Sequence, residues 1–280
     1  MTDAYGLFGY PVHHSWSPFI HGMFARQTAQ DMTYRLYESA PERFRSDVLE
    51  FFSHGGRGLN VTLPHKRAAA DLVNELTPRA ERADAVNTIV RRDELLLGDN
   101  TDGAGLLADL VGNMKLSWKS PRILVLGAGG AARGAMEPLL SLAPRLLVIA
   151  NRTAERAQAL ALEFAELGEV RGCEFSRLEH QRFDLIVNAT AASLRGEAPL
   201  IPIDVVDSMT TCYDMAYGVG DTPFVAWARR LGAGRAEQGW GMLVEQAAEA
   251  FQLWRGVRPD TAPVLEGLRS RAATGPRTPA

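Results

Sequence analysis

Short runs of apolar residues alternate with amphipathic, helix-like segments along most of the chain. This alternation predicts an α/β fold, because each buried strand needs a helix to cover it. The first set of predicted strands covers residues 5–9, 33–38, 58–63, 86–90 and 95–97. A second set follows a polar stretch at 117–121 and covers 123–126, 146–150, 184–189 and 211–215. The second set has the pattern of a doubly wound parallel sheet, in which ligands bind beyond the carboxyl ends of the strands.

Prolines and capping residues predict where the helices begin. Ser17 is expected to be an N-cap, with Pro18 at the first helical position. Pro41 opens a second helix, and residues 64–66 lead into a third that is expected to end near Leu76. Later helices are expected from Gly130, Thr153 and Thr222 and over residues 242–254.

Residues 122–134, RILVLGAGGAARG, predict a buried strand, a glycine turn and the start of a helix. Gly127, Gly129 and Gly130 let the backbone approach a phosphate, and the helix N-terminus offers free N–H groups. Ala128 and Ala131 lie within the same turn. The arrangement is typical of a site for a dinucleotide pyrophosphate, although a glycine turn alone is a weak signal.

The end of the next predicted strand indicates which dinucleotide is bound. NAD sites usually place Asp or Glu there for the ribose 2′-hydroxyl, whereas this chain has Asn151, Arg152 and Thr153, with Arg156 one helical turn later. Two guanidinium groups beside a helix start suit a 2′-phosphate. We therefore predict NADP as the cofactor. The alternative is a βαβ unit with ordinary solvated arginines.

Composition and charge narrow the class of protein. The 280 residues are 46% hydrophobic and 22% charged, as in ordinary globular proteins with one large or two modest domains. A net charge of −3 without a Lys/Arg cluster argues against nucleic acid or an anionic membrane as a partner. No apolar run approaches the length of a membrane span, and the N-terminus lacks a signal peptide. Cys173 and Cys212 have neither the spacing of metal ligands nor the density of a disulfide framework, which indicates a reducing cytoplasm. The six histidines include no pair at the spacing of metal ligands on a helix, so we expect no metal ion.

Four polar segments, residues 14–18, 60–66, 85–88 and 99–103, lie at the ends of predicted strands in the first half. Asn60 and Thr62 share one face of their strand, because side chains alternate along a strand. Lys66 then begins the next helix near the same edge of the sheet.

These segments also have purely structural interpretations. Ser17 is a plausible cap whether or not it binds a ligand, whereas Ser15 has no such structural role in the sequence. The side-chain amide of Asn60 could simply form hydrogen bonds with backbone groups at the end of the strand. Residues 100–103 are able to form a turn in which Thr101 or Asp102 caps a helix at 105–110.

Together with the glycine turn and the stretch 239–246, these segments resemble the shikimate dehydrogenase family, from about Tyr5 to Pro263. The resemblance implies the NADPH-dependent, reversible reduction of 3-dehydroshikimate to shikimate, on the route to chorismate and the aromatic amino acids. It implies an α/β substrate domain at 1–101, completed by C-terminal helices at 240–270. A Rossmann-type NADP domain is implied at 102–239, with the active site in the cleft between the domains. The polar tail at 271–280 is expected to fray.

The resemblance also assigns roles to single residues. Lys66 and Asp102 are the implied catalytic pair beside the carbon that exchanges hydride. The residues implied to hold the substrate carboxylate are Ser15, Ser17, Thr62 and Tyr217. Those implied to hold the ring hydroxyls are Asn60, Asn87, Asp102 and Gln246. The implied cofactor-binding set adds Thr190, Met215 and Gly239 to the glycine turn and the arginines, with Met215 lining the nicotinamide pocket.

The chemistry of ketone reduction agrees with this assignment. The carbonyl oxygen gains negative charge and then a proton, and an ammonium group within hydrogen-bond reach is able to stabilise that oxygen and donate the proton. The sequence leaves open whether Lys66 carries the proton or acts as a fixed charge while Asp102 or water shares the transfer.

Two stretches depart from the family pattern. Residues 191–193 are Ala-Ala-Ser where Ser-Ser-Gly is frequent, and Glu237, Gln238 and Trp240 replace a usual Asp, Gly and Leu. The enzymatic alternative is a relative that acts on quinate or aminoshikimate. An alternative of another class is a non-catalytic NADP-binding sensor. The expected partner is a small-molecule substrate, and the chain is expected to be a monomer or a homodimer.

Overall fold

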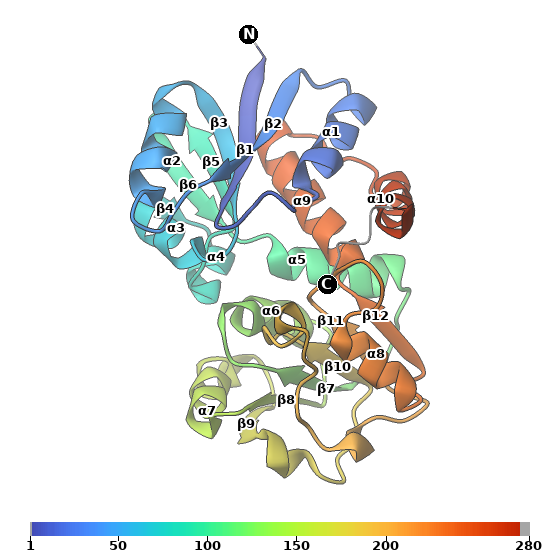
Figure 1. Ribbon diagram of the computed structural model, residues 1–280. Helices are drawn as coiled ribbons and strands as arrows, with labels where there is room; N and C mark the ends of the chain where they lie inside the picture. Colours follow the sequence, from blue (N-terminus) through green and yellow to red (C-terminus); the bar gives the residue numbers. More distant parts are fainter. Residues whose placement is uncertain (1, 275–280) are drawn as a thin grey trace. The chain divides into compact units, whose positions relative to one another are not determined.

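A computed structural model describes residues 2–274 of the chain (Figure 1). The chain divides into two compact units, each with its own sheet. Among the described residues, 2–105 and Leu243–Leu268 form the N-terminal unit, and Leu106–Met242 forms the central unit together with 269–274. The chain passes from one unit to the other after Gly105 and returns after Met242, whereas the predicted domain boundaries follow residues 101 and 239. The assignment of the two units as substrate and NADP domains stays a prediction.

The N-terminal unit is built on a six-stranded mixed sheet with the order β2-β1-β3-β5-β6-β4. β1 (Asp3–Gly9) pairs in parallel with β2 (Met32–Glu38) and β3 (Gly56–Val61). β5 (Thr88–Arg92) runs antiparallel to β3 and β6 (Leu95–Asp99), and the short β4 (Glu75–Leu76) pairs with β6. This register places Asn60 opposite Thr88, and Thr88 opposite Asp99. The end of β3, the start of β5 and the end of β6 therefore meet at one edge of the sheet.

Helices cover both faces of this sheet (Figure 1). α2 (Phe44–Ser53), α3 (Lys66–Leu72) and α4 (Pro78–Ala83) pack apolar residues against one face. On the other face, α1 (Ser17–Gln27) and α9 (Trp240–Arg255) contact each other through Phe24 and Phe251. α9 also contacts β1, because the Trp254 ring packs against that of Tyr5 at a tilt of 36°. The helix predicted at 242–254 therefore packs on the first sheet, although the strands of that sheet lie more than 100 residues earlier in the chain.

The central unit is a six-stranded, entirely parallel sheet with the order β12-β11-β10-β7-β8-β9. The strands are β7 (Arg122–Leu126), β8 (Leu146–Asn151), β9 (Val170–Glu174), β10 (Leu185–Asn188), β11 (Thr211–Asp214) and β12 (Arg235–Gln238). The order reverses beside β7, which is the topological switch point of a doubly wound sheet. α6 (Gly130–Leu140) and α7 (Ala154–Glu163) cover one face, and α8 (Pro223–Arg230) covers the other.

The remaining helical segments are short, except for the last. α5 (Asp102–Leu107) follows β6 and continues as a π-helical turn, Ala108–Asn113. Short 3₁₀ turns occupy Ala165–Leu167, Phe175–Leu178, Ser193–Arg195 and Ile203–Val205. α10 (Ala262–Thr274) ends the described chain. Residues 271–274 of the predicted frayed tail are therefore helical, and residues 275–280 lie outside the described residues.

The α/β class and every predicted strand are present, but β4, β9 and β12 lie outside the predicted set. β9 and β12 are edge strands with the polar sequences VRGCE and RAEQ, and β4 has only two residues. None of the three has the apolar run that predicts a buried strand.

Three helix predictions are wrong in detail. Trp16, not Ser17, is the N-cap of α1, and Ser17 is the first helical residue. α2 begins at Phe44 rather than at Pro41. α3 ends at Leu72 rather than near Leu76, because the chain leaves the helix to pair residues 75–76 with β6.

Replacing Trp254 should weaken the docking of α9 on the first sheet. Its ring lies 4.9 Å from that of Tyr5, and its indole N–H donates to the carbonyl of Ile89 at 3.0 Å. We expect Trp254→Ala to lower the free energy of unfolding by about 3 kcal/mol, measured by urea denaturation. Trp254→Phe keeps an aromatic ring and should cost less. An alanine variant as stable as the wild type would contradict this account of α9.

Candidate active site

The ammonium group of Lys66 contacts the carboxylate of Asp102 in the N-terminal unit. Lys66 is the first residue of α3, Asp102 is the first of α5, and Nζ lies 2.5 Å from Oδ2. The two side chains are 28% and 18% exposed, so water is partly excluded from the pair and a ligand can still reach it. The two residues of the predicted catalytic pair therefore lie together, although 36 positions separate them in the chain.

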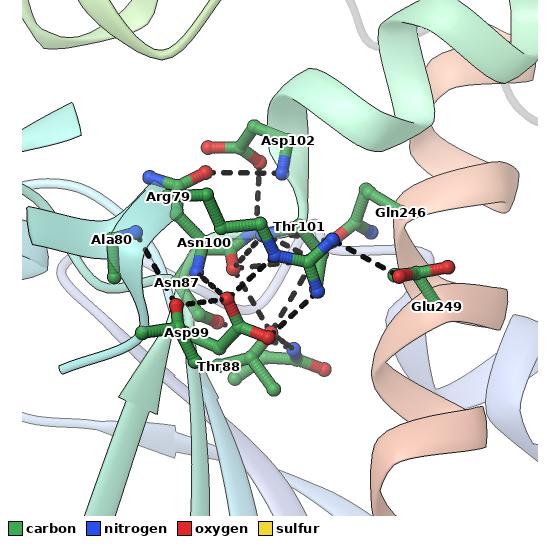
Figure 2. Close-up of polar contacts among 12 residues, drawn as sticks. Arg79, Ala80, Asn87, Thr88, Asp99, Asn100, Thr101, Asp102, Gln246 and Glu249 are labelled. Atoms are coloured by element: carbon green, nitrogen blue, oxygen red, sulfur yellow. Dashed lines mark hydrogen bonds and ion pairs between the residues drawn. The ribbon is translucent and has the colours of Figure 1, made fainter. Parts of the chain in front are cut away.

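Asn87 fixes the direction of the Asp102 carboxylate (Figure 2). Its Nδ2 donates to Asp102 Oδ1 at 2.8 Å and to Thr101 Oγ1 at 3.0 Å, and its Oδ1 accepts from the Thr101 N–H at 2.8 Å. Asn87 is 3% exposed. Asp102 therefore turns away from Lys66 only by breaking its hydrogen bond with the buried Asn87.

Gln246, on α9, lies beside Asn87 (Figure 2). Its Oε1 accepts from Asn87 Nδ2 at 3.4 Å, and its Nε2 donates to the carbonyl of Leu243 at 2.8 Å. Gly105 allows this approach, because a Cβ at that position would lie 2.7 Å from the backbone nitrogen of Gln246. The predicted ring-binding residues Asn87, Asp102 and Gln246 are thus brought together.

The hydrogen-bonding capacity of Asn60 is largely used within the protein. Its Oδ1 accepts from the Tyr34 hydroxyl at 2.8 Å, and its Nδ2 donates to the Asn87 carbonyl at 3.2 Å and to Thr88 Oγ1 at 3.1 Å. Both amide hydrogens are occupied, so Asn60 offers a ligand only the second lone pair of Oδ1. The structural interpretation of Asn60 is supported, and its contact with substrate stays a prediction.

The two serines lie together at the start of α1. Ser15 Oγ donates to Ser17 Oγ at 3.1 Å and accepts the Ser17 N–H at 3.2 Å. Ser15, which precedes the N-cap Trp16, therefore satisfies the backbone N–H of the first helical residue. Thr62 follows β3, and its methyl group occupies the space that the missing side chain of Gly9 leaves. Tyr217, the fourth residue of the predicted carboxylate set, belongs to the central unit.

The glycine turn has the shape that a pyrophosphate site needs. Gly127 follows β7 with φ +103°, a conformation that favours glycine, and a Cβ there would lie 3.2 Å from the carbonyl oxygen of Ala189. Gly129 is the N-cap of α6, and a Cβ at Gly129 or Gly130 would meet nothing within 4 Å. Gly129, Gly130 and Ala131 are exposed, and Ala128 lies between the glycines. The open helix start therefore fits a bound phosphate.

The predicted 2′-phosphate residues lie at the end of β8 and the start of α7. Asn151 Nδ2 donates to the carbonyl of Thr153 at 3.0 Å, which holds the turn between them. Arg152 and Arg156 are exposed, and neither guanidinium forms an ion pair with another residue of the described part. Both charges are thus free to meet an anion.

The loops after β10 and β11 are joined by a buried carboxylate, which the sequence analysis missed. Asp214 accepts from Ser193 Oγ at 2.6 Å, Thr222 Oγ1 at 2.6 Å, Asn188 Nδ2 at 3.0 Å and the Ala216 N–H at 3.1 Å. Burial raises the pKa of Asp214, and these hydrogen bonds oppose the rise without cancelling it. Ser193, one of the departures from the family pattern, is therefore part of this network.

The remaining predicted cofactor residues are on or beside these loops. Thr190 Oγ1 donates to Asn188 Oδ1 at 2.7 Å. A Cβ at Gly239 would lie 2.6 Å from the carbonyl oxygen of Met215, so only glycine allows this approach. The Tyr217 ring packs against Trp240 with centroids 4.7 Å apart, and burial raises the pKa of Tyr217 to about 12. The unusual Trp240 thus packs on a predicted substrate residue.

Arg79 and Asp99 form a second cluster that the sequence analysis missed (Figure 2). Arg79 Nε lies 2.7 Å from Asp99 Oδ1, and Nη2 lies 2.6 Å from Oδ2. Burial raises the pKa of Asp99, but hydrogen bonds from Arg79 and Thr77 and the charge of Arg79 outweigh burial, so the pKa lies below its usual value. Asp99 is 1% exposed and ends β6, next to the loop that carries Asp102.

The arrangement around Lys66 is suited to proton exchange at an oxygen. The ammonium group supplies positive charge and a proton, and Asp102, held by Asn87, keeps that group in place. Within residues 2–274 there is no group of three or more His, Cys, Asp and Glu side chains that could hold a metal ion. In the same range, no helix is long and apolar enough to cross a membrane.

Three family models match consecutive parts of the chain. A model of the shikimate dehydrogenase substrate binding domain matches residues 7–89, one of shikimate/quinate 5-dehydrogenase matches 109–206, and one of the shikimate 5′-dehydrogenase C-terminal domain matches 239–269. The first model therefore matches a part of the N-terminal unit, the second matches a part of the central unit, and most of the third match falls on the returning segment Leu243–Leu268 of the N-terminal unit.

Individual relatives resemble almost the whole chain. The shikimate dehydrogenase (NADP(+)) of Methylococcus capsulatus is 53% identical, with 97% of this chain and 98% of the relative covered. The crystal structure of an Ael1 enzyme from Pseudomonas putida has a TM-score of 0.90 and 44% identity, covering 95% of this chain and 98% of that one. The Thermus thermophilus shikimate 5-dehydrogenase in complex with NADP(H) and shikimate has a TM-score of 0.85 and 31% identity, with 96% and 99% covered.

Removing the partner of Asp99 should change stability in a pH-dependent way. Arg79→Met leaves a buried carboxylate unpaired at pH 7, which we expect to cost about 3–5 kcal/mol in the free energy of unfolding. In the wild type the lowered pKa of Asp99 means that its stabilising contribution is present above about pH 4 and is lost below it. In the variant, burial without Arg79 raises that pKa, so a proton relieves the unpaired charge as the pH falls. The stability difference should therefore shrink from pH 7 towards pH 4 in urea titrations, and a constant difference would contradict the assignment.

Proposed function

This chain belongs to the shikimate dehydrogenase family, and from that premise we propose that it catalyses the reversible, NADPH-dependent reduction of 3-dehydroshikimate to shikimate. The observation that carries the proposal is the contact between Lys66 and Asp102, which puts an ammonium group and a carboxylate at one accessible edge of the first sheet. A sensor that only binds NADP has no need for this pair.

NADP suits the residues of the central unit. The open start of α6 after the glycine turn would hold the pyrophosphate, and Arg152 and Arg156, with Asn151 and Thr153, would hold the 2′-phosphate. Thr190, Met215 and Gly239 would border the nicotinamide. When bound, the reduced cofactor supplies the hydride that the substrate carbon receives.

Residues of the N-terminal unit would act on the carbonyl oxygen of the substrate, which needs a proton when the carbon receives hydride. Lys66 stabilises the negative charge that develops on the carbonyl oxygen and delivers a proton to it. Asp102 orients the ammonium group through its Oδ2, and Asn87 holds Asp102 through its Oδ1. Asp102 also accepts a hydrogen bond from a ring hydroxyl, so one carboxylate positions both the substrate and the proton donor.

The remaining polar side chains would bind the rest of the substrate. Gln246 and Asn87 contact ring hydroxyls, with Asn60 contributing its free lone pair. The hydroxyl groups of Ser15, Ser17, Thr62 and Tyr217 bind the carboxylate. The substrate domain corresponds to 1–101 with 240–270, and the NADP domain to 102–239. We place the enzyme in the cytoplasm, where Cys173 and Cys212 remain free thiols as in the structure.

An absorbance assay of the nicotinamide tests the activity. Purified protein should oxidise NADPH in the presence of 3-dehydroshikimate, and in the reverse direction it should prefer shikimate to quinate. Lys66→Ala should lower kcat by about 10²–10⁴, the usual effect of losing a general acid or base. Arg67→Ala, at the next position and exposed, is the matched control and should keep wild-type turnover. No turnover by the wild type would favour the sensor, preference for quinate would favour that paralogue, and an active Lys66→Ala would remove Lys66 from the mechanism.

Arg152→Ala should raise the KM for NADPH far more than the KM for NADH. The side chain is exposed and forms no ion pair within the described chain, so its removal should cost little stability and leave the 2′-phosphate without a partner. Steady-state kinetics with both cofactors measure the ratio. Arg171→Ala, which removes an exposed arginine of β9 that pairs with Glu169, is the control. Equal changes for NADPH and NADH would refute the role of Arg152.

A further inference from the structure

Asn100 holds the backbone at the start of α5. The Asp102 N–H donates to Asn100 Oδ1 at 3.1 Å, and Asn100 Nδ2 donates to the carbonyl of Ala85 at 3.0 Å. The Asn100 N–H donates to Asp99 Oδ1 at 2.7 Å. Asn100 is 5% exposed. The backbone of Asp102 is thus connected to Asp99 through a residue that is held at three points.

Asp99 is in turn held by its own donors. Oδ1 accepts from Thr77 Oγ1 at 2.6 Å and from Arg79 Nε at 2.7 Å, and Oδ2 accepts from Arg79 Nη2 at 2.6 Å. The two bonds from Arg79 are parallel, which fixes the plane of the carboxylate as well as its charge. A lysine would supply the charge without that fork.

Arg79 also reaches the helix that carries Gln246 (Figure 2). Its Nη1 donates to Glu249 Oε1 at 3.0 Å, and Glu249 lies on α9 three positions after Gln246, on the same side of the helix. Glu249 Oε2 accepts from Arg258 as well, so the carboxylate stays placed on the helix surface. One guanidinium group therefore contacts both the end of β6, three residues before Asp102, and the helix that carries Gln246.

We propose that Arg79 is a positioning residue for the reaction: through Asp99 and Asn100 it holds Asp102 against Lys66, and through Glu249 it holds Gln246 beside Asn87. This inference rests on the proposed function of those residues. Arg79 forms hydrogen bonds to neither Lys66 nor Asp102 in the described structure, and its side chain is 33% exposed. In this proposal Arg79 sets the geometry of the site through Asp99, Asn100 and Glu249, and not through a contact with the substrate.

The two arms of Arg79 predict two different kinetic defects. Losing the Asp99 arm should lower kcat, because small errors in the placement of a reacting group cost up to about 10²-fold in rate. Losing the Glu249 arm should raise the KM for shikimate, because Gln246 is the residue that it places. Arg79, Asp99 and Glu249 all belong to the N-terminal unit, so the KM for NADP should stay within twofold of the wild type.

Steady-state oxidation of shikimate separates these effects. For Arg79→Lys we expect kcat to fall about tenfold or more, because the charge remains and the parallel bonds are lost. For Glu249→Gln we expect a several-fold higher KM for shikimate with kcat within twofold. Arg57→Met, which breaks an exposed ion pair with Asp3 in the same sheet, is the matched control and should change neither constant. Thermal melts on all three variants report folding.

The outcomes distinguish the inference from its premise. A merely structural Arg79 would lower the melting temperature of Arg79→Lys and leave kcat within twofold, and that result would overturn the proposal. An unchanged KM for shikimate in Glu249→Gln would overturn its second arm. A wild type that does not oxidise shikimate would instead refute the proposed function. If Arg79→Lys does not fold, Asp99→Asn, which keeps the size of the side chain, tests the first arm by the same loss of kcat.

Discussion

The contact between Lys66 and Asp102 depends on a constraint that neither residue supplies alone. An ammonium and a carboxylate that are free in water gain little from meeting, because solvation and side-chain entropy offset the attraction. Here the end of β3, the start of β5 and the end of β6 meet at one sheet edge. The side-chain amide of Asn87, just before β5, contacts Thr101 and Asp102 after β6, and its backbone carbonyl accepts from Asn60 of β3. The side-chain entropy of Lys66 and Asp102 is therefore lost when the protein folds, not when a ligand binds, so the site is preorganised.

The central unit is suited to holding an anion with few committed side chains. The switch point of its doubly wound sheet presents a helix start beside a glycine turn, so in the proposed function backbone N–H groups would make most of the contacts with the pyrophosphate. The exposed Arg152 and Arg156 add charge where the sheet has no partner for them. The loops after β10 and β11 need stronger support, because they have no regular structure for most of their length. Asp214 supplies it by accepting four hydrogen bonds in a buried position.

Local patterns in the sequence predict the local features of this molecule. Apolar runs locate nine of the strands, and the glycine turn predicts a nucleotide site, since both patterns are encoded within a few consecutive residues. The convergence of Lys66 with Asp102 requires the register of β3, β5 and β6, so only the family resemblance indicated it in advance. The ion pair of Arg79 with Asp99 and the buried network of Asp214 were missed. In sequence, a charged residue near a strand end looks the same whether its side chain is buried or solvated. The strands β9 and β12 were missed because they lie at the edges of their sheet and pair on one side only. Their residues are largely polar, so they lack the apolar run that predicts a buried strand.

A double-mutant cycle on Lys66 and Asp102 tests the central claim most directly. The catalytic efficiency, kcat/KM for shikimate, would be measured for the wild type, Lys66→Met, Asp102→Asn and the double variant. If the two groups act as one unit, the double variant should lose about as much efficiency as the worse single variant, because the second substitution removes an interaction that is already broken. Losses that multiply would show that the two side chains act independently, and that result would contradict the account.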